Sequence, residues 1–228
     1  MNEENTSEPG HAPHRILLVD DHPLLRDGLR LLIDDVPDME VCGEASNADE
    51  AVEAMERTSP DLAVVDIFLP GRNGIELTKT LCRRWPDTRV LILSMHDESI
   101  YARRALRAGA MGYVMKQEVS KTIVDAVRTV LKGKRYMSAH IAAELARDIV
   151  SGSDKKSASG VNLLSDRELE IFERFGRGLT RSEIAERLGV SVKTVEAHRQ
   201  NIREKLKIKD ATDFLRRATL WVEDAGTS

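Results

Sequence analysis

ILLVDDHPLLRDGLRLLI, residues 16–33, decides the first half of the fold. A short apolar run ends in two aspartates, and leucine and isoleucine then recur at helical spacing. Similar apolar runs lie at residues 62–65, 90–93 and 113–115, and a weaker run at 40–43 fits an edge strand. Continuous apolar runs are typical of parallel strands buried on both faces. Amphipathic helical patterns separate them, so we predict an α/β domain with a doubly wound, five-stranded parallel sheet.

The second half of the chain shows helical periodicity and no strand pattern. SGSDKKSASG, residues 151–160, has nothing to bury and predicts a flexible linker. We therefore expect a disordered tail over residues 1–14, the α/β domain over 15–133, a helix and linker over 134–160, and an all-α domain over 161–228.

Composition excludes several classes of protein. Hydrophobic residues make up 41% of the 228 residues, which is enough for a core, whereas 4% aromatic residues argues against sugar-binding or base-stacking surfaces. The two cysteines lack metal-ligand spacing, which favours free thiols in a reducing compartment. No signal peptide is evident, and no run approaches the ~18 apolar residues of a membrane span. A cytoplasmic protein without a membrane partner is expected.

Polar side chains end four of the predicted strands, where open α/β sheets bind ligands. They are Asp20, Asp21, Asp66, Ser94 and Lys116. Clustered carboxylates repel one another, and a hard divalent cation with oxygen ligands, most simply Mg²⁺, relieves that repulsion. Asp66 is then expected to attack phosphorus as a carboxylate nucleophile, while Ser94 and Lys116 hold the phosphoryl oxygens. A lone aspartate at a strand end is usually a cap or loop residue, but the whole set is hard to explain that way.

Four stretches, ILLVDDHPLLRDGL, VVDIFLPGRNGIEL, VLILSMH and GAMGYVMK, resemble the receiver domain of two-component response regulators in the NarL/FixJ branch, over residues 15 to about 133. The resemblance implies a flavodoxin-like fold with Asp66 as the phosphoacceptor. It implies that Asp20, Asp21 and Asp66 hold Mg²⁺ together with the backbone carbonyl of Phe68. It also implies a switch pair of Ser94 and Tyr113, and Lys116 as the phosphate-binding ammonium. Gln117 stands where many receivers have a cis proline, which leaves the geometry of that turn open.

Capping signals organise the second half. SDRE (165–168) and TRSE (180–183) are capping boxes, Gly189 is expected to end the second helix, and Ser191 to cap a third that runs to about Lys207. Asp210 is expected to open a fourth. Two helices joined by a tight turn, the second of them basic, form a helix-turn-helix pattern. From Lys193 to Lys209 six basic residues face two acidic ones, a local excess of +4 in a chain of net charge −4.

The third helix has two faces at 100° per residue. Val195, Ile202 and Leu206 mark the core face, and the polar face suits a major groove. There Gln200 is expected to read adenine, Glu196 to accept from cytosine and Ala197 to contact a thymine methyl. Arg199 lies nearer the core line and is assigned to backbone phosphate. The alternative, a merely solvated charged helix, does not explain the paired capping boxes and tight turn.

Residues 163 to about 220 closely resemble the LuxR-type DNA-binding domain, on the stretch LSDRELEIFERFGRGLTRSEIAERLGVSVKTVEAHRQNIREKLKI. The resemblance implies a four-helix domain in which Lys193, Thr194 and Arg199 touch phosphates, and Arg203 joins the DNA-binding set. It also implies that the last helix pairs two copies on DNA, with Phe214 and Leu215 on its apolar side.

These observations predict a transcription regulator rather than an enzyme: a sensor histidine kinase phosphorylates Asp66, and a homodimer binds promoter DNA. The unphosphorylated first half is expected to mask the recognition helix. A phosphatase of the haloacid-dehalogenase kind is disfavoured, because Phe68 stands where that family has its second aspartate. A third interpretation keeps DNA binding but treats the first half as a dimerisation or ligand-sensing module without phosphorylation.

Overall fold

The computed structural model describes residues 12–95, 98–151 and 160–225. Most of the predicted tail and linker therefore lie outside the described residues. The first half, here called the α/β half, contains one sheet of five parallel strands in the order β2-β1-β3-β4-β5, which places β2 at an edge as predicted. The strands are β1 (His14–Val19), β2 (Met39–Ala45), β3 (Leu62–Asp66), β4 (Arg89–Ser94) and β5 (Gly112–Met115).

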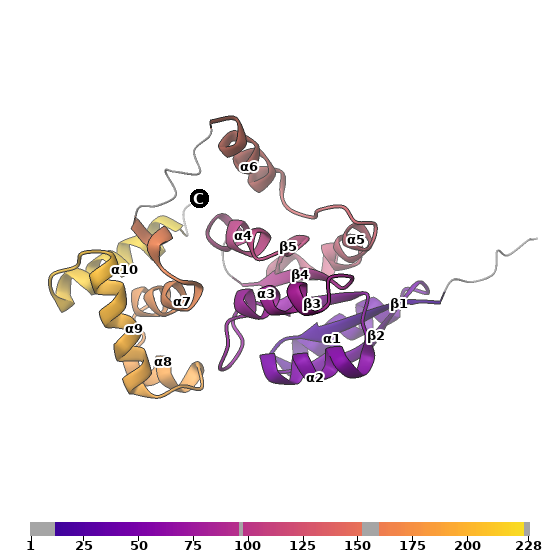
Figure 1. Ribbon diagram of the computed structural model, residues 1–228, viewed down its shortest axis with the longest axis horizontal. Helices are drawn as coiled ribbons and strands as arrows, with labels where there is room; N and C mark the ends of the chain where they lie inside the picture. The colour runs from indigo at the N-terminus through magenta and orange to yellow at the C-terminus, as the bar shows by residue number, and fades with distance from the viewer. Residues whose placement is uncertain (1–11, 96–97, 152–159, 226–228) are drawn as a thin grey trace, which may run out of the picture.

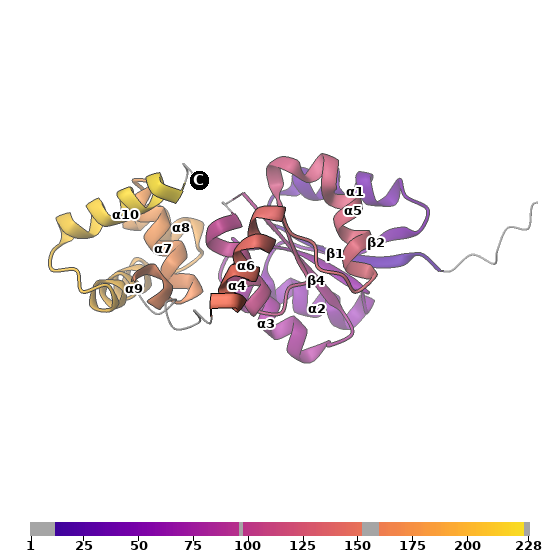
Figure 2. The same ribbon diagram turned by 90° about the horizontal axis from the view of Figure 1, so that it is seen from above.

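Five α-helices cover the two faces of this sheet. They are α1 (Pro23–Asp34), α2 (Ala48–Thr58), α3 (Gly74–Arg84), α4 (Glu98–Arg107) and α5 (Val119–Leu131), the last preceded by a 3₁₀ turn, η1 (Lys116–Glu118). Figure 2 shows α1 and α5 on one face and α2 and α3 on the other. β1, β3, β4 and β5 are largely buried from both sides, which explains why their segments are apolar without alternation, whereas the edge strand β2 is only partly buried.

The helical half follows α6 (Ala139–Ser151). It consists of a 3₁₀ turn, η3 (Gly160–Leu163), and four helices, α7 (Asp166–Gly176), α8 (Arg181–Arg187), α9 (Val192–Lys205) and α10 (Ala211–Ala225). Both predicted capping boxes are confirmed, at Ser165 with Glu168 and at Thr180 with Glu183. Gly189 has φ +62° and follows Leu188, the C-cap of α8, as expected of the residue that stops a helix.

The expectation that Phe214 belongs to a dimer surface is wrong. Its side chain is fully buried and packs edge-on against the rings of Phe172 and Phe175 on α7. The apolar side of α10 is therefore divided, because one part of it forms the core of the helical half. Leu215 and Leu220, which are about half exposed, are the apolar residues of α10 left for a second copy.

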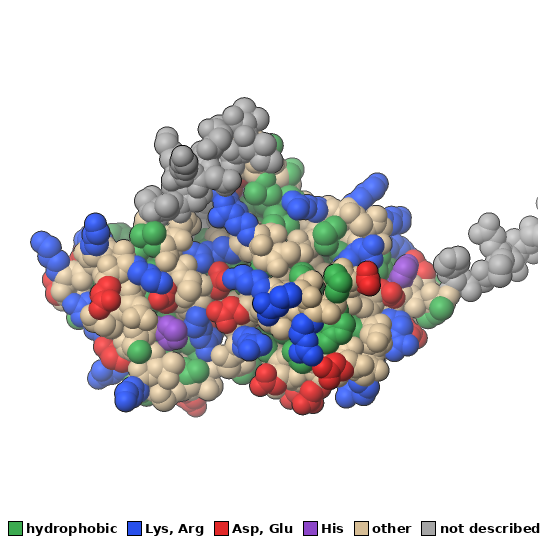
Figure 3. Space-filling model, in the orientation of Figure 1, with side chains coloured by type: hydrophobic (Ala, Val, Ile, Leu, Met, Phe, Trp, Pro, Cys, Tyr) green, Lys and Arg blue, Asp and Glu red, His purple; other side chains and the backbone are tan. Residues whose placement is uncertain are grey.

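The two halves are in contact, as Figure 1 shows for α7 and α8 beside the α/β half. The apolar core on the α2 and α3 face of the sheet continues without a break into the core of the helical half. Acidic and basic side chains lie next to one another along the junction on the face drawn in Figure 3. We call this arrangement the closed arrangement.

Among the described residues, no helix has the length and apolar character needed to cross a bilayer.

Candidate functional site: an acidic pocket at the junction of the two halves

Asp66 is the last residue of β3, and its side chain is buried at the carboxyl end of the sheet. Lys116, the first residue after β5, places its Nζ 2.7 Å from Oδ2 of Asp66 and 2.6 Å from Oδ2 of Asp20. Three groups that lie far apart in the chain therefore meet within one ion-pair network. The parallel strands bring them together because their carboxyl ends share one edge of the sheet.

The electrostatics of Asp66 are set by opposing influences. Burial and, to a smaller extent, the neighbouring Asp20 together raise the pKa of its carboxyl to about 6 against the attraction of Lys116. Burial also lowers the pKa of Lys116, but the two carboxylates raise it more, so the ammonium is held in its charged form. The pocket thus holds a carboxylate that is poorly solvated and ready to be neutralised by a bond or a cation.

Asp20, Asp21, His22 and Asp66 each offer a ligand atom, and these atoms lie within 4.8 Å of one another. Oδ2 of Asp20 and Oδ1 of Asp21 accept no well-directed hydrogen bond from the described residues, although Lys116 and His22 lie within 2.7 Å of them. Carboxylate oxygens with unused lone pairs are the donor set of a hard divalent cation. The acid-rich cluster therefore fits the Mg²⁺ expected from the sequence. Sequence reasoning missed His22, whose position directly after the two aspartates was the available signal.

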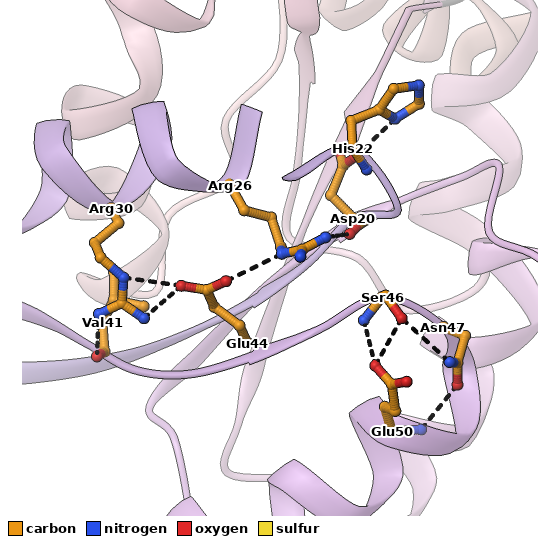
Figure 4. A network of polar contacts seen from close by, with 9 residues as sticks. All are labelled: Asp20, His22, Arg26, Arg30, Val41, Glu44, Ser46, Asn47 and Glu50. Atoms are coloured by element: carbon orange, nitrogen blue, oxygen red, sulfur yellow. Dashed lines mark hydrogen bonds and ion pairs between the residues drawn. The ribbon is translucent and has the colours of Figure 1, made fainter. Parts of the chain in front are cut away.

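The backbone of Asp20 is fixed from the side of α1. Arg26 donates to the carbonyl oxygen of Asp20 and, through Nε, to Oε2 of Glu44 at 3.0 Å, as Figure 4 shows. Glu44 also accepts from Nε of Arg30 at 2.8 Å, and these bonds hold its pKa low despite partial burial. His22 closes the turn by donating its backbone N–H to Oδ1 of Asp20 at 2.9 Å.

A close approach of backbone supports Asp66 from the other side. Gly74 begins α3, and a Cβ built on it would lie 1.9 Å from the carbonyl oxygen of Asp66. Only glycine fits there without moving the strand end. Asn73 caps the same helix by accepting from the N–H of Ile75. The backbone of Phe68 also hydrogen-bonds to the Asp66 carboxylate; its carbonyl as a metal ligand stays a prediction.

The two residues predicted as a switch pair, Ser94 and Tyr113, are both buried, at the end of β4 and within β5. Tyr113 pairs with Ile92 in the sheet, and Ser94 with Met115. The described residues contain no cis peptide bond, so the Lys116–Gln117 peptide is trans. The structure brings Asp20, Asp66 and Lys116 into direct contact and leaves the pairing of Ser94 with Tyr113 a prediction.

The helical half contacts the α/β half through charged side chains that are buried at the junction. The hydroxyl of Tyr101 on α4 donates to Oε2 of Glu173 at 2.5 Å, and Asn73 Nδ2 donates to Oε2 of Glu170 at 3.1 Å. Asp166 accepts from Lys79 at 2.7 Å and from Arg104 at 3.0 Å. Each acid stands on α7, so this helix carries most of the polar contact between the halves.

A main-chain bond completes the junction. The N–H of Gly71, in the loop after β3, donates to the carbonyl of Leu188 at the end of α8 at 2.9 Å. Beside it lies a cavity of about 440 Å³ that contains the acidic pocket. Asp21, Asp66 and Lys116 line it from the α/β half, and Arg174 and Arg187 line it from the helical half. Nothing in the sequence indicated that these two arginines line the same cavity as Asp66.

The candidate DNA surface is α9. Val195 and Ile202 are buried as predicted, whereas Lys193, Thr194, Ala197 and Gln200 are exposed. The expectation that the α/β half covers these residues is therefore wrong: it contacts α7 and the turn before α9. The loop after β3 reaches the carbonyl of Leu188, three residues before the Ser191 cap of α9.

Three other predicted DNA contacts are engaged within the protein. Arg199 lies 5.6 Å from the ring centroid of Phe214 and 3.3 Å from the carboxylate of Glu196. Arg203 donates through Nη2 to the carbonyl of Lys209 at 2.7 Å. Burial lowers the pKa of His198, and the nearby cation of Arg167 lowers it further. Contact of Arg199 with phosphate would require it to leave Glu196.

Comparison with known proteins identifies both halves. The family of response regulator receiver domains matches residues 16–128, and the luxR family of bacterial regulatory proteins matches residues 162–218. The oxygen regulatory proteins NreC of Staphylococcus carnosus and of Staphylococcus aureus are each 36% identical to this chain over 205 residues. The matched segment covers 88% of this chain and 94% of either relative.

Solved structures agree. A LuxR-family two-component response regulator from Aurantimonas sp. is 42% identical with a TM-score of 0.56, covering 61% of this chain and 99% of that one. A second structure is that of RcsB from Salmonella enterica serovar Typhimurium, bound to a promoter in the presence of the phosphomimetic BeF₃⁻. It has a TM-score of 0.60 and 23% identity, and the match covers 90% of this chain and 98% of that one. At this identity the likeness is one of fold alone. The chain belongs to the two-component response regulators that join a receiver domain to a LuxR-type DNA-binding domain.

Proposed function

We propose that Asp66 accepts a phosphoryl group from the phosphohistidine of a sensor kinase and that this modification controls binding of promoter DNA by α9. The observation that carries the proposal is the contact of Lys116 with both Asp66 and Asp20 inside a cavity that opens beside the sheet. A buried nucleophile, a fixed cation and a cluster of carboxylate oxygens with free lone pairs are what transfer of a phosphoryl group to a carboxylate needs.

The transfer forms one bond to phosphorus and breaks another. An Oδ atom of Asp66 forms a bond to phosphorus while the bond from phosphorus to the donor imidazole nitrogen breaks, and that nitrogen keeps the electron pair. Asp20, Asp21 and Asp66, with the carbonyl of Phe68, would hold Mg²⁺, which screens the repulsion between the carboxylates and the incoming phosphoryl oxygens. Lys116 then neutralises the charge left on the product, and Ser94 supplies a hydroxyl donor.

The junction supports control of the second half by the first. Ser94 ends β4, the strand next to that of Asp66, and Tyr113 lies in β5 beyond it. Tyr101 on α4 bonds to Glu173 of the helical half. A shift of Ser94 toward a phosphoryl group, followed by Tyr113, would change the surface of α4 and β5 that holds Glu173. The helical half would then be released to pair with a second copy through Leu215 and Leu220.

On DNA, the proposal assigns Lys193, Thr194 and Arg199 to phosphates, Glu196, Ala197 and Gln200 to base edges, and Arg203 to the same surface. The exposure of Lys193, Thr194, Ala197 and Gln200 on one helix supports this assignment. The chain would catalyse only its own phosphotransfer and dephosphorylation. A cytoplasmic location belongs to the proposal, since promoter DNA is found there.

Phosphorylation is tested with a small phosphodonor and Mg²⁺, followed by electrophoresis on a gel that retards phosphoproteins. The wild type is expected to shift and Asp66→Asn not to shift. The exposed Asp87 on the α/β half provides a matched control, and Asp87→Asn should shift like the wild type. An unmodified wild type would favour the alternative in which the receiver acts without phosphorylation. A shift retained in Asp66→Asn would refute the assignment of the acceptor.

A further inference from the structure

Two arginines of the DNA-binding domain line the same cavity as the phosphoacceptor. Arg174 stands on α7 and Arg187 on α8, and both reach the cavity of about 440 Å³ that also contains Asp66 and Lys116. The receiver mechanism proposed above uses neither. The DNA-binding domain therefore adds two positive charges to the cavity in which the phosphoryl group is accepted, and we ask what these charges do.

Arg174 is only partly satisfied by its present contacts. Its Nη2 donates to Oε1 of Glu170 at 3.0 Å, and its guanidinium lies 5.4 Å from the ring centroid of Phe68, two residues after Asp66. Its Nε is buried, yet it donates to no acceptor within the described part of the chain. A buried donor without an acceptor is costly. An anionic oxygen arriving beside Phe68 would supply both an acceptor and a counter-charge.

Arg187 is an exposed residue that also lines the cavity. Its charge lowers the pKa of Glu183 on the same helix, with the cap bonds from Thr180 as the larger cause. The absence of a buried ion pair at Arg187 in the described ranges leaves its guanidinium able to follow a ligand in the cavity. Arg187 therefore tests a ligand role with little disturbance of the junction itself.

The chemistry of the cavity names the ligand. Three carboxylates and one ammonium give the receiver side of the pocket a net negative charge, and a cation bound to them offsets it. An acyl phosphate on Asp66 replaces one unit of negative charge by about 1.5–2 units and adds three acceptor oxygens. Guanidinium groups match phosphoryl oxygens in both charge and donor geometry.

We propose that Arg174 and Arg187 bind the phosphoryl group on Asp66, so that in the closed arrangement the phosphoryl site is built by both domains. This inference rests on the proposed function of Asp66. Its consequence is that the added charge does not by itself drive the domains apart. Phosphorylation strengthens this one contact, and release of the helical half depends on loss of the separate contact between Tyr101 and Glu173.

The test measures binding of BeF₃⁻ with Mg²⁺ to the full chain, by titration and by the ¹⁹F NMR signals of the bound fluorides. The variants are Arg187→Gln, Arg174→Gln and a control, Arg181→Gln, which removes the same charge from an exposed position of α8 that does not line the cavity. Each of the first two is expected to weaken binding about three- to tenfold and to shift the ¹⁹F signals, as loss of one partly exposed charged contact should. Arg181→Gln should behave like the wild type.

The outcomes separate this inference from the proposed function. BeF₃⁻ binding that is lost in Asp66→Asn but equal in the wild type and both arginine variants would leave the phosphoacceptor standing and overturn the shared site. Tighter binding in Arg187→Gln would also overturn it, because the arginine would then obstruct the pocket. Failure of BeF₃⁻ to bind any of the proteins would overturn both proposals.

Discussion

Replacement of Tyr101 by phenylalanine should open the closed arrangement without phosphorylation. The hydroxyl of Tyr101 donates to Glu173 at 2.5 Å, and both side chains are buried at the junction. Burial raises the pKa of Tyr101 well above its ordinary value of 10.0, and Glu173 raises it further, so the hydroxyl keeps its proton and acts as the donor. Tyr101→Phe removes this one donor and leaves the ring in place.

The size of the effect follows from the charge of the acceptor. A hydrogen bond to a charged group contributes about 1.5–3 kcal/mol, so its loss should increase the population of the open form by about 10- to 150-fold. Glu173 keeps Arg177, whose Nη2 lies 2.8 Å from Oε1. That arginine is half exposed and belongs to the same helix, so it compensates the carboxylate whether the junction is open or closed.

Amide hydrogen exchange of Gly71 reports the opening directly, because its N–H donates to Leu188 across the junction. In Tyr101→Phe this amide should exchange faster by the same factor of about 10–150, while the amide of Val65 inside β3 should keep its rate. Tyr136→Phe, a change of the same kind on the receiver away from α7, is the control. Unchanged exchange at Gly71 in Tyr101→Phe would refute the view that this bond holds the two domains together.

Three further predictions concern the rest of the chain. Burial raises the pKa of Glu168 but Lys205 and the Ser165 cap lower it more, so its net pKa lies below 4.5; its stabilising effect is therefore complete above that value and is lost as the pH falls through the folded pKa. Thermal unfolding of Glu168→Gln against wild type should thus show a deficit at pH 7 that shrinks as the pH falls below 4.5 and is lost below the folded pKa of Glu168. Gln200→Ala should relax base preference, with a loss of about 1–3 kcal/mol in the discrimination between bases. Lys193→Ala should weaken binding to every sequence and reduce the salt dependence of binding. Fluorescence anisotropy measures both, and an unchanged base preference in Gln200→Ala would contradict the assignment. Gly74→Ala, whose Cβ would meet the Asp66 carbonyl, should destabilise the receiver by about 1–3 kcal/mol or more in urea, and a wild-type midpoint would show that the strand end yields easily.

The sheet and the convergence of its acids could be predicted because both follow from local patterns. Apolar runs indicate the strands, and parallel strands bring their last residues to one edge, so sequence alone places Asp66 near Asp20 and Lys116. The capping boxes likewise indicate the starts of α7 and α8. The apolar pattern of α10 was misleading at Phe214, because periodicity shows that a side is apolar but not whether a partner helix of the same domain covers it.

The junction could not be predicted, since its contacts join residues that are far apart and individually unremarkable. Glu170 and Glu173 are almost completely buried, although charged residues on a capped helix are normally solvated. Their partners, Asn73 and Tyr101, belong to another domain. The placement of Arg174 and Arg187 in the lining of the cavity that contains Asp66 depends on the same docking and leaves no trace in local spacing.

The concentration of the junction on one helix has a consequence for protein engineering. Asp166, Glu170 and Glu173 all project from α7, and Asp166 forms ion pairs with Lys79 and Arg104 of the receiver. A chimera that kept this receiver but took a foreign output module without these acids would leave those cations unmatched. Such a hybrid should not form the closed arrangement and should bind its promoter without phosphorylation, whatever promoter it recognised.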